Sequence, residues 1–337
     1  MSAAYRAATA LAAIDLRALA ALRVGLGLLV LGDVGLRALS LRAHYTDAGV
    51  LPRAELLQQF AWLHEWGLSL HLLGGSTLAQ AVLFALHAAA GLALVVGFRT
   101  TAAVGLAWLL TTSVQLRNLY IGGGFDALLR MLLLWGMFVP LGARASLDAR
   151  RRGGPPATAA HLSVGGVALL LQVAVVYLAA GLAKGETALW RDGDALALVL
   201  HDEFFTTAFG AWLGAQESLC RLLTWAVLAA ELAAPFLLFA LAPLPRLRLA
   251  LVAGLAAMNA GFGLALSVGG FPWAMTVALL PFVPAFAWDR AEAATATLRQ
   301  RWTTATAGLA APVVPYAAAA RAARAPAVWV AQGVCAL

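Results

Sequence analysis

Eight strongly apolar segments constrain this chain more than any other feature. Of its 337 residues, 62% are hydrophobic and 12% are charged. A helix needs about 20 apolar residues to cross a bilayer, and helices satisfy their own backbone groups there. The sequence therefore predicts an all-α, multi-pass helix bundle in the cell membrane, with about eight transmembrane helices. The segments are 19–39, 77–96, 101–115, 127–141, 162–183, 222–241, 247–266 and 271–287.

The third, fourth and eighth of these segments are short. Each falls below the length that crosses a bilayer without strain. One of the three could therefore be tilted, bent or re-entrant.

The basic residues indicate orientation. The net charge is +7, and arginines concentrate before the first segment, in alternate loops and after the last segment. Because cytoplasmic loops carry the excess of positive charge, both termini are predicted to be cytoplasmic. The bilayer, and not nucleic acid, is then the partner that the basic composition implies. Residues 1–290 are expected to form the membrane domain, and 291–337 an Ala- and Arg-rich cytoplasmic tail.

Lys184 is the only lysine among 23 basic residues. It follows the uncharged segment 162–183, where membrane meets water. A desolvated amine can lose its proton, whereas arginine stays charged. Lys184 is therefore the first candidate for a catalytic base, and the alternative is a single cation snorkelling at the membrane edge.

Ionisable groups inside the apolar segments form a small set. Glu231 lies in the middle of the sixth segment without a local partner, so it must find a cation or take up a proton. Arg23 and Lys184 are both possible partners. Asp126 and Arg130 are spaced to pair on one helical face. The alternative role for each group is hydrogen bonding between helices.

Further polar groups extend this set. Arg37 lies one turn beyond Asp33 and could pair with it. Asn259 is a candidate pocket residue, and His87 is more typical of a packed, hydrogen-bonded side chain. Neither cysteine has zinc-ligand spacing, so we expect no metal site.

Two motifs between the apolar segments carry further candidates. In the first, at 44–53, His44 and Tyr45 precede a turn that contains Asp47 and ends at Arg53. In the second, at 117–126, Asn118 precedes three glycines at a helix start, where free N–H groups can face a polar ligand. The alternatives are a folded loop and a hinge. Trp190 lies in the long outer segment 184–220 and suits a membrane interface or a pocket wall.

Six stretches, in this order, resemble the HTTM (horizontally transferred transmembrane) domain, the membrane part of vitamin K-dependent gamma-carboxylase. The resemblance extends over about residues 15–290. The stretches are HYTDAGVLPR at 44–53, RNLYIGGGFDALLR at 117–130, LGARASLD at 141–148, VYLAAGLAKGETALWRDG at 176–193, ELAAPFLLF at 231–239 and MNAGFGLALSVGGFPW at 258–273.

The resemblance implies chemistry for Lys184. In the carboxylase, a lysine in the stretch similar to AGLAKG deprotonates reduced vitamin K. Oxygen converts that quinol into a strong base, which removes a proton from a peptide glutamate, and the carbanion captures carbon dioxide. Glu231 matches an acidic position of the family. The implied cofactor is reduced vitamin K or another quinol, and the implied partners are a lipid-soluble quinone and an exported peptide at the outer face.

One departure from the family keeps other functions open. The carboxylase uses a histidine near the third and fourth segments, yet this chain has none between His87 and His161. A non-enzymatic membrane partner for maturation of a secreted peptide is the second hypothesis. A small-molecule or proton transporter that uses Asp33 and Glu231 is the third.

Overall fold

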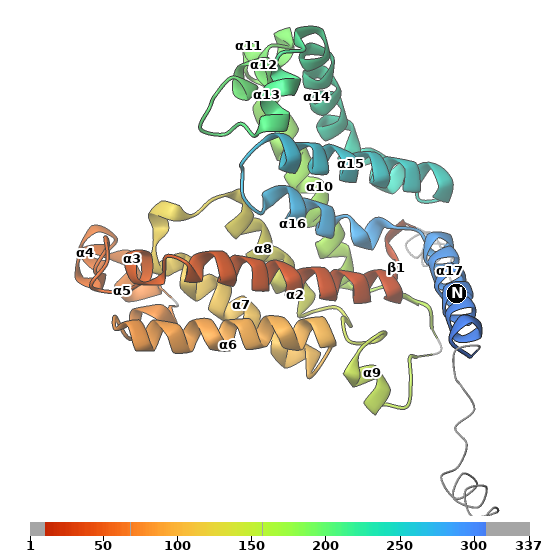
Figure 1. Ribbon diagram of the computed structural model, residues 1–337, viewed down its shortest axis with the longest axis horizontal. Helices are drawn as coiled ribbons and strands as arrows, with labels where there is room; N and C mark the ends of the chain where they lie inside the picture. The colour runs from red at the N-terminus through yellow and green to blue at the C-terminus, as the bar shows by residue number, and fades with distance from the viewer. Residues whose placement is uncertain (1–10, 68, 157, 308–337) are drawn as a thin grey trace, which may run out of the picture. The chain divides into compact units, whose positions relative to one another are not determined.

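The computed structural model describes residues 11–67, 69–156 and 158–307. The chain divides into two compact units, Met1–Trp288 and Asp289–Leu337. The described part is almost entirely helical (Figure 1). Its longer helices are α2 (Leu16–Ala38), α6 (Thr77–Val96), α7 (Thr100–Arg117), α8 (Gly124–Gly136), α10 (Val164–Gly185), α14 (Glu217–Ala240), α15 (Pro245–Ala265), α16 (Phe271–Ala278) and α17 (Ala285–Ala307).

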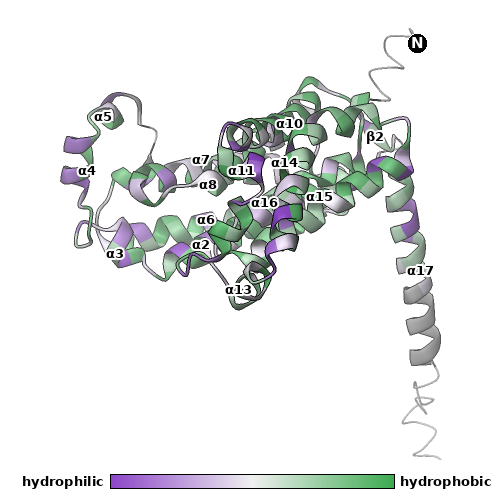
Figure 2. Ribbon diagram, turned by 90° about the horizontal axis from the view of Figure 1, so that it is seen from above, coloured by the Kyte–Doolittle hydropathy of each residue, from purple (hydrophilic) through white to green (hydrophobic). Residues whose placement is uncertain are grey.

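Short elements connect these helices. Strands β1 (Ile14–Asp15) and β2 (Ala160–His161) pair antiparallel. The other short elements are α3 (Leu41–Tyr45), α4 (Arg53–Gln59), α5 (Trp62–Trp66), η1 (Leu70–Leu72), η2 (Leu119–Ile121), α9 (Leu147–Arg151), α11 (Ala188–Asp192), α12 (Ala195–Leu200), α13 (Ala208–Gly214) and η3 (Leu280–Phe282). Figure 2 shows hydrophilic residues on α3 and α4 and hydrophobic residues along α10 and α14.

Five of the described helices are long and apolar enough to cross a membrane: α2, α6, α10, α14 and α15. A bent pair, Phe271–Phe282 with Ala285–Thr297, makes up to six if it is one broken span. The predicted all-α membrane architecture is confirmed at this level, whereas the count of about eight and the sides of the termini are not.

The three short predicted segments account for the difference in number. The fourth corresponds to α8, whose 13 residues extend only about 20 Å and do not cover a bilayer core of about 30 Å. The third corresponds to α7, which has 18 residues and includes Thr, Ser, Gln and Arg side chains. The eighth is interrupted where Pro281 and Pro284 end regular helical hydrogen bonding.

Close helix contacts organise the first unit. Gly27 of α2 approaches Gly91 of α6, so that a Cβ added at Gly27 would lie 2.8 Å from the Gly91 carbonyl oxygen. Small residues at such crossings let backbones pack tightly in membrane bundles. Helices α2 and α6 therefore form one closely packed pair, and α10 and α14 form another.

Arg23 of α2 is fully buried within this packing. Its guanidinium donates to the carbonyl oxygens of Leu94, Val95 and Ala145 at 2.5, 2.9 and 2.6 Å. Leu94 and Val95 lie in the last turn of α6, where carbonyl oxygens lack i+4 backbone donors of the same helix. The Arg23 guanidinium therefore binds backbone carbonyls at a helix end and does not pair with Glu231.

Asp148 of α9 caps the start of α7. Its carboxylate accepts hydrogen bonds from the backbone N–H of Arg99 at 2.9 Å and of Thr100 at 2.7 Å, and from the Thr100 hydroxyl at 2.7 Å. Partial burial would raise the pKa of the Asp148 carboxyl, but the hydrogen bonds from Thr100 and Arg99 outweigh it and hold this pKa below its usual value. The carboxylate thus stabilises the fold in its ionised form.

We expect Asp148→Ala to lower the free energy of unfolding by about 1–2 kcal/mol, the usual cost of losing an N-terminal cap. Because the folded-state pKa is depressed, the loss should be complete above the ordinary aspartate pKa of about 3.9 and should shrink as pH falls further. Detergent-solubilised protein unfolded by denaturant at several pH values measures this. Asp192→Ala, at an exposed acid, is the control and should change little. Equal stability of Asp148→Ala and wild type at neutral pH would contradict the assignment.

Candidate functional site

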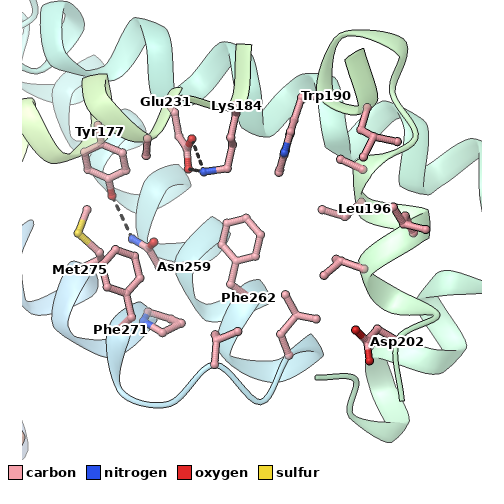
Figure 3. A pocket seen from close by; sticks show the side chains of 18 of the residues that line it. Tyr177, Lys184, Trp190, Leu196, Asp202, Glu231, Asn259, Phe262, Phe271 and Met275 are labelled. Atoms are coloured by element: carbon pink, nitrogen blue, oxygen red, sulfur yellow. Dashed lines mark hydrogen bonds and ion pairs between the residues drawn. The ribbon is translucent and has the colours of Figure 1, made fainter. Parts of the chain in front are cut away.

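A cavity of about 720 Å³ lies among α10, α11, α12, α14, α15 and α16. Most of its wall is apolar, and a small number of polar side chains enter it (Figure 3). Ligand pockets typically have volumes of about 300–1,000 Å³ and this mixture of apolar walls and few polar groups. Its polar and charged lining residues are Tyr177, Lys184, Trp190, His201, Asp202, Glu231 and Asn259.

Lys184 and Glu231 form an ion pair on the wall of this cavity (Figure 3). The Lys184 Nζ donates to both carboxylate oxygens of Glu231, at 2.8 and 2.7 Å. The Glu231 side chain is 7% exposed and the Lys184 side chain 24% exposed. Of the two partners that the sequence left open for Glu231, the structure selects Lys184.

Gly181 lies where α10 and α14 approach closely, beside this pair. A Cβ at Gly181 of α10 would lie 3.0 Å from the Leu232 backbone nitrogen and 3.1 Å from the Glu231 carbonyl carbon of α14. The absence of a side chain therefore lets the two helices approach closely where Lys184, almost one turn further along α10, reaches Glu231.

Trp190 of α11 completes the surroundings of the amine. The Lys184 Nζ lies 5.2 Å from the centre of the Trp190 ring, within the range of a cation–π interaction. The predicted candidate Trp190 thus lies in the cavity wall beside Lys184. The carboxylate of Glu231 and the ring face of Trp190 both contact the ammonium form of Lys184.

Tyr177 and Asn259 form a second polar pair in the cavity (Figure 3). The Asn259 Nδ2 donates to the Tyr177 hydroxyl oxygen at 3.0 Å. The Tyr177 hydroxyl hydrogen forms no hydrogen bond within the described part of the chain. A ligand oxygen in the cavity can therefore accept from Tyr177.

Sequence reasoning singled out Asn259 but missed Tyr177, because a tyrosine in an apolar helix looks like a packing residue. The spacing of Tyr177 relative to Lys184 could have indicated its role. Tyr177 lies about two turns before Lys184, so both fall on the face of α10 that also carries Gly181.

His201 also lines the cavity, near α12. Its Nδ1–H donates to the carbonyl oxygen of Ala197 at 2.6 Å, so Nε2 carries the free lone pair. The residue is exposed and lies beside the exposed Asp202. The chain has no histidine between His87 and His161, but His201 brings an imidazole to the cavity from another segment.

Asn118, Asp126 and Arg130 do not line the cavity of Lys184. The Asn118 amide donates to the His44 carbonyl oxygen at 3.2 Å, and its oxygen accepts from the Tyr120 backbone N–H at 3.2 Å. Asn118 therefore holds two loop segments together.

The predicted pair between Asp126 and Arg130 is wrong. Asp126 pairs instead with Arg37, which reaches it from α2, and Arg130 forms no ion pair among the described residues. Arg37 also pairs with Asp33 at 2.8 Å, as the spacing predicted. A cation from a neighbouring helix replaces the expected local partner.

The loop motif at 44–53 is held by its own polar side chains. Asp47 accepts from the Arg53 Nε at 3.0 Å and from its Nη2 at 2.7 Å, and Arg53 donates to the Leu72 carbonyl oxygen at 2.9 Å. The hydrogen bonds from the Arg53 side chain lower the pKa of Asp47. The buried Tyr45 accepts from Arg37 at 2.9 Å, and His44 Nδ1 lies 3.0 Å from the Ser40 hydroxyl. These contacts organise the loop away from Lys184.

His87 of α6 packs against α7. The buried His87 Nε2 lies 3.0 Å from the Thr111 hydroxyl, which is the packed, hydrogen-bonded role expected for it. Within residues 11–67, 69–156 and 158–307, no group of three or more His, Cys, Asp or Glu side chains could hold a metal ion.

Comparison with known proteins supports the resemblance found in the sequence. The family model described as the HTTM domain matches residues 12–288. This range includes every residue that lines the cavity of Lys184. No match was found among curated proteins or solved structures.

The Lys184–Glu231 pair predicts an asymmetric double-mutant cycle. Lys184→Met leaves Glu231 buried without its cation and should cost about 2 kcal/mol, less than the 3–5 kcal/mol of a fully buried pair because Lys184 is partly exposed. Glu231→Met should cost less, since the lysine can turn toward solvent. The double variant should be more stable than the sum of the single losses implies. Denaturant unfolding in detergent measures all four proteins, and additive losses would refute the coupling.

Proposed function

The chain belongs to the HTTM family, and from this membership we propose that it is a membrane enzyme that uses Lys184 as the base toward a lipid-soluble quinol. The observation that carries the proposal is the Lys184–Glu231 pair on the wall of an apolar cavity. The pair places an amine, which can give up its proton, at the wall of a ligand-sized cavity.

Glu231 gives Lys184 a place to leave its own proton. If one proton moves from the Lys184 Nζ along either hydrogen bond to Glu231, both groups become neutral. This transfer adds no net charge to a low-dielectric site, where isolated charges are costly. The resulting neutral amine has a lone pair that can accept a hydroxyl proton from a bound substrate. Lys184 would be the catalytic base and Glu231 its proton store.

The cavity suits a flat aromatic ring with polar substituents. The side chains of Trp190, Phe262 and Phe271 contribute aromatic wall, against which a quinol ring can pack. Lys184 can accept a proton from one oxygen of a ligand, and Tyr177 can donate to an oxygen. The volume of about 720 Å³ is within the usual range for such ligands.

A bound reduced quinone would supply the hydroxyl hydrogen that Lys184 removes and, with molecular oxygen, would give the quinone epoxide and water. Reduced vitamin K or another quinol is therefore the proposed cofactor. The exposed His201 and Asp202 are the groups past which an exported peptide would reach the cavity.

Lys184→Arg should lower quinol epoxidation by at least 100-fold, because general-base catalysis commonly contributes about 10²–10⁴-fold and a guanidinium does not give up its proton. The assay uses purified protein in nanodiscs with reduced vitamin K and oxygen, and follows epoxide formation by chromatography. Arg221→Lys is the matched control, since Arg221 pairs with Asp194 on the surface at 3.1 Å and does not line the cavity. Wild-type turnover by Lys184→Arg would rule the base assignment out.

A non-enzymatic role in maturing a secreted peptide is a second candidate. Phe204 is 84% exposed and Trp212 is 59% exposed, and Phe209 stacks on Trp212. This aromatic surface on the segment between α12 and α14 could bind an extended peptide. If an exported peptide copurifies equally with wild type and Lys184→Ala, and no epoxidation is found, this second function is favoured. A transporter has less support, because Asp33 and Glu231 both have basic partners.

A further inference from the structure

A separate cavity of about 760 Å³ lies beside α2, facing the start of α8 and of α16. It shares Val268 and Phe271 with the cavity of Lys184, but its polar groups are different. Its charged and titratable lining residues are Asp33, Arg37, His44, Tyr45 and Asp126.

Negative charge exceeds positive charge at this cavity. Asp33 and Asp126 share the single cation Arg37, which also donates to the Tyr45 hydroxyl. Two carboxylates therefore face one guanidinium. Asp33 is only 8% exposed, and its buried Oδ2 has no hydrogen-bond partner.

This imbalance points to a positively charged ligand. A buried carboxylate that is not neutralised is costly in a low-dielectric region, and an added cation removes that cost. Apolar side chains such as Leu28 and Trp273 line the same cavity, so the chemistry favours an organic cation with an apolar body. Asp126, whose side chain is 12% exposed, is the acid that such a cation can reach directly.

Glycines keep the cavity open. A Cβ added at Gly32, Gly123 or Gly269 would meet no atom within 4 Å, and all three residues line the cavity. An interior helical glycine such as Gly32 costs about 1 kcal/mol relative to alanine. The space beside it is thus free for a ligand.

The remaining walls are apolar and exposed. Leu28, Leu36 and Trp273 line the cavity and are 57%, 67% and 46% exposed. Two of them lie on α2, one of the helices apolar enough to cross a membrane. Exposed apolar side chains on such a helix face lipid, so a ligand can enter sideways from the bilayer.

We propose that this second cavity binds a lipid-soluble organic cation, with a protonated amine against Asp126 and Asp33 and an apolar body along Leu28 and Trp273. The charged end would complete the two-acid, one-arginine cluster. The apolar end would occupy the space left by Gly32. Two sources present a protonated amine: a free alkylamine, and the zwitterionic headgroup of an ethanolamine lipid, whose phosphate would lie outside the acidic cluster.

Photolabelling of the full chain in nanodiscs tests the site. The probes are an alkylamine, the alcohol of the same chain length and phosphatidylethanolamine, each carrying a diazirine. Mass spectrometry should find the amine on peptides from α2 or α16 at least fivefold above the alcohol. Labelling by both amine and lipid supports a headgroup ligand, and labelling by the amine alone supports a free amine. Equal labelling by amine and alcohol overturns the proposal.

Paired variants separate binding from folding. Gly32→Leu should abolish amine labelling by filling the cavity. Gly35→Leu should retain it, because Gly35 is on the same helix with nothing within 4 Å of an added Cβ and does not line the cavity. Asp126→Asn should bring amine labelling to the level of the alcohol, and Arg221→Lys, which lines neither cavity, should leave it unchanged. Equal labelling of the two leucine variants would overturn the assignment even if Asp126→Asn failed to fold.

Discussion

The ion pair between Lys184 of α10 and Glu231 of α14 joins two neighbouring helices at the cavity wall. Gly181 allows a close approach between α10 and α14. The Lys184–Glu231 pair then neutralises two charges that would each be costly alone. The cavity of Lys184 depends on this arrangement, since its other walls come from helices that pack around the same pair. Gly181 thus lies at the close helix crossing that adjoins the only lysine of the chain.

Much of the fold was predictable because long apolar runs have few alternatives in lipid. The helices around 77–96 and 162–183 appear almost where hydropathy placed them. The shorter runs were less certain, since hydropathy does not determine whether an apolar segment crosses, bends or packs inside a bundle. In 271–287 the prolines at 281 and 284 were visible in the sequence, yet their effect on that segment emerged only in three dimensions.

The candidate site was predictable for single residues but not for their partners. Lys184 stood out by composition, and Glu231 by the cost of a carboxylate at its position. The spacing along one helix predicted the wrong partner for Asp126. Its carboxylate pairs with Arg37 of α2 and not with Arg130 of the same helix. A sequence pattern reports neighbours on the same helix, whereas charge pairing in a bundle is decided between helices. His201 illustrates the same limit, since a loop residue reaches the cavity only through the path of α12.

The two charged cavities differ in a way that bears on their roles. In the first, one amine faces one acid, so a proton can move between them without changing the net charge. In the second, two acids face one arginine, and no internal proton transfer removes the excess. The first arrangement suits chemistry that needs a transient neutral base, and the second suits retention of a positive ligand. Val268 and Phe271 border both cavities, so the two sites are adjacent through an apolar wall although they differ in their polar groups.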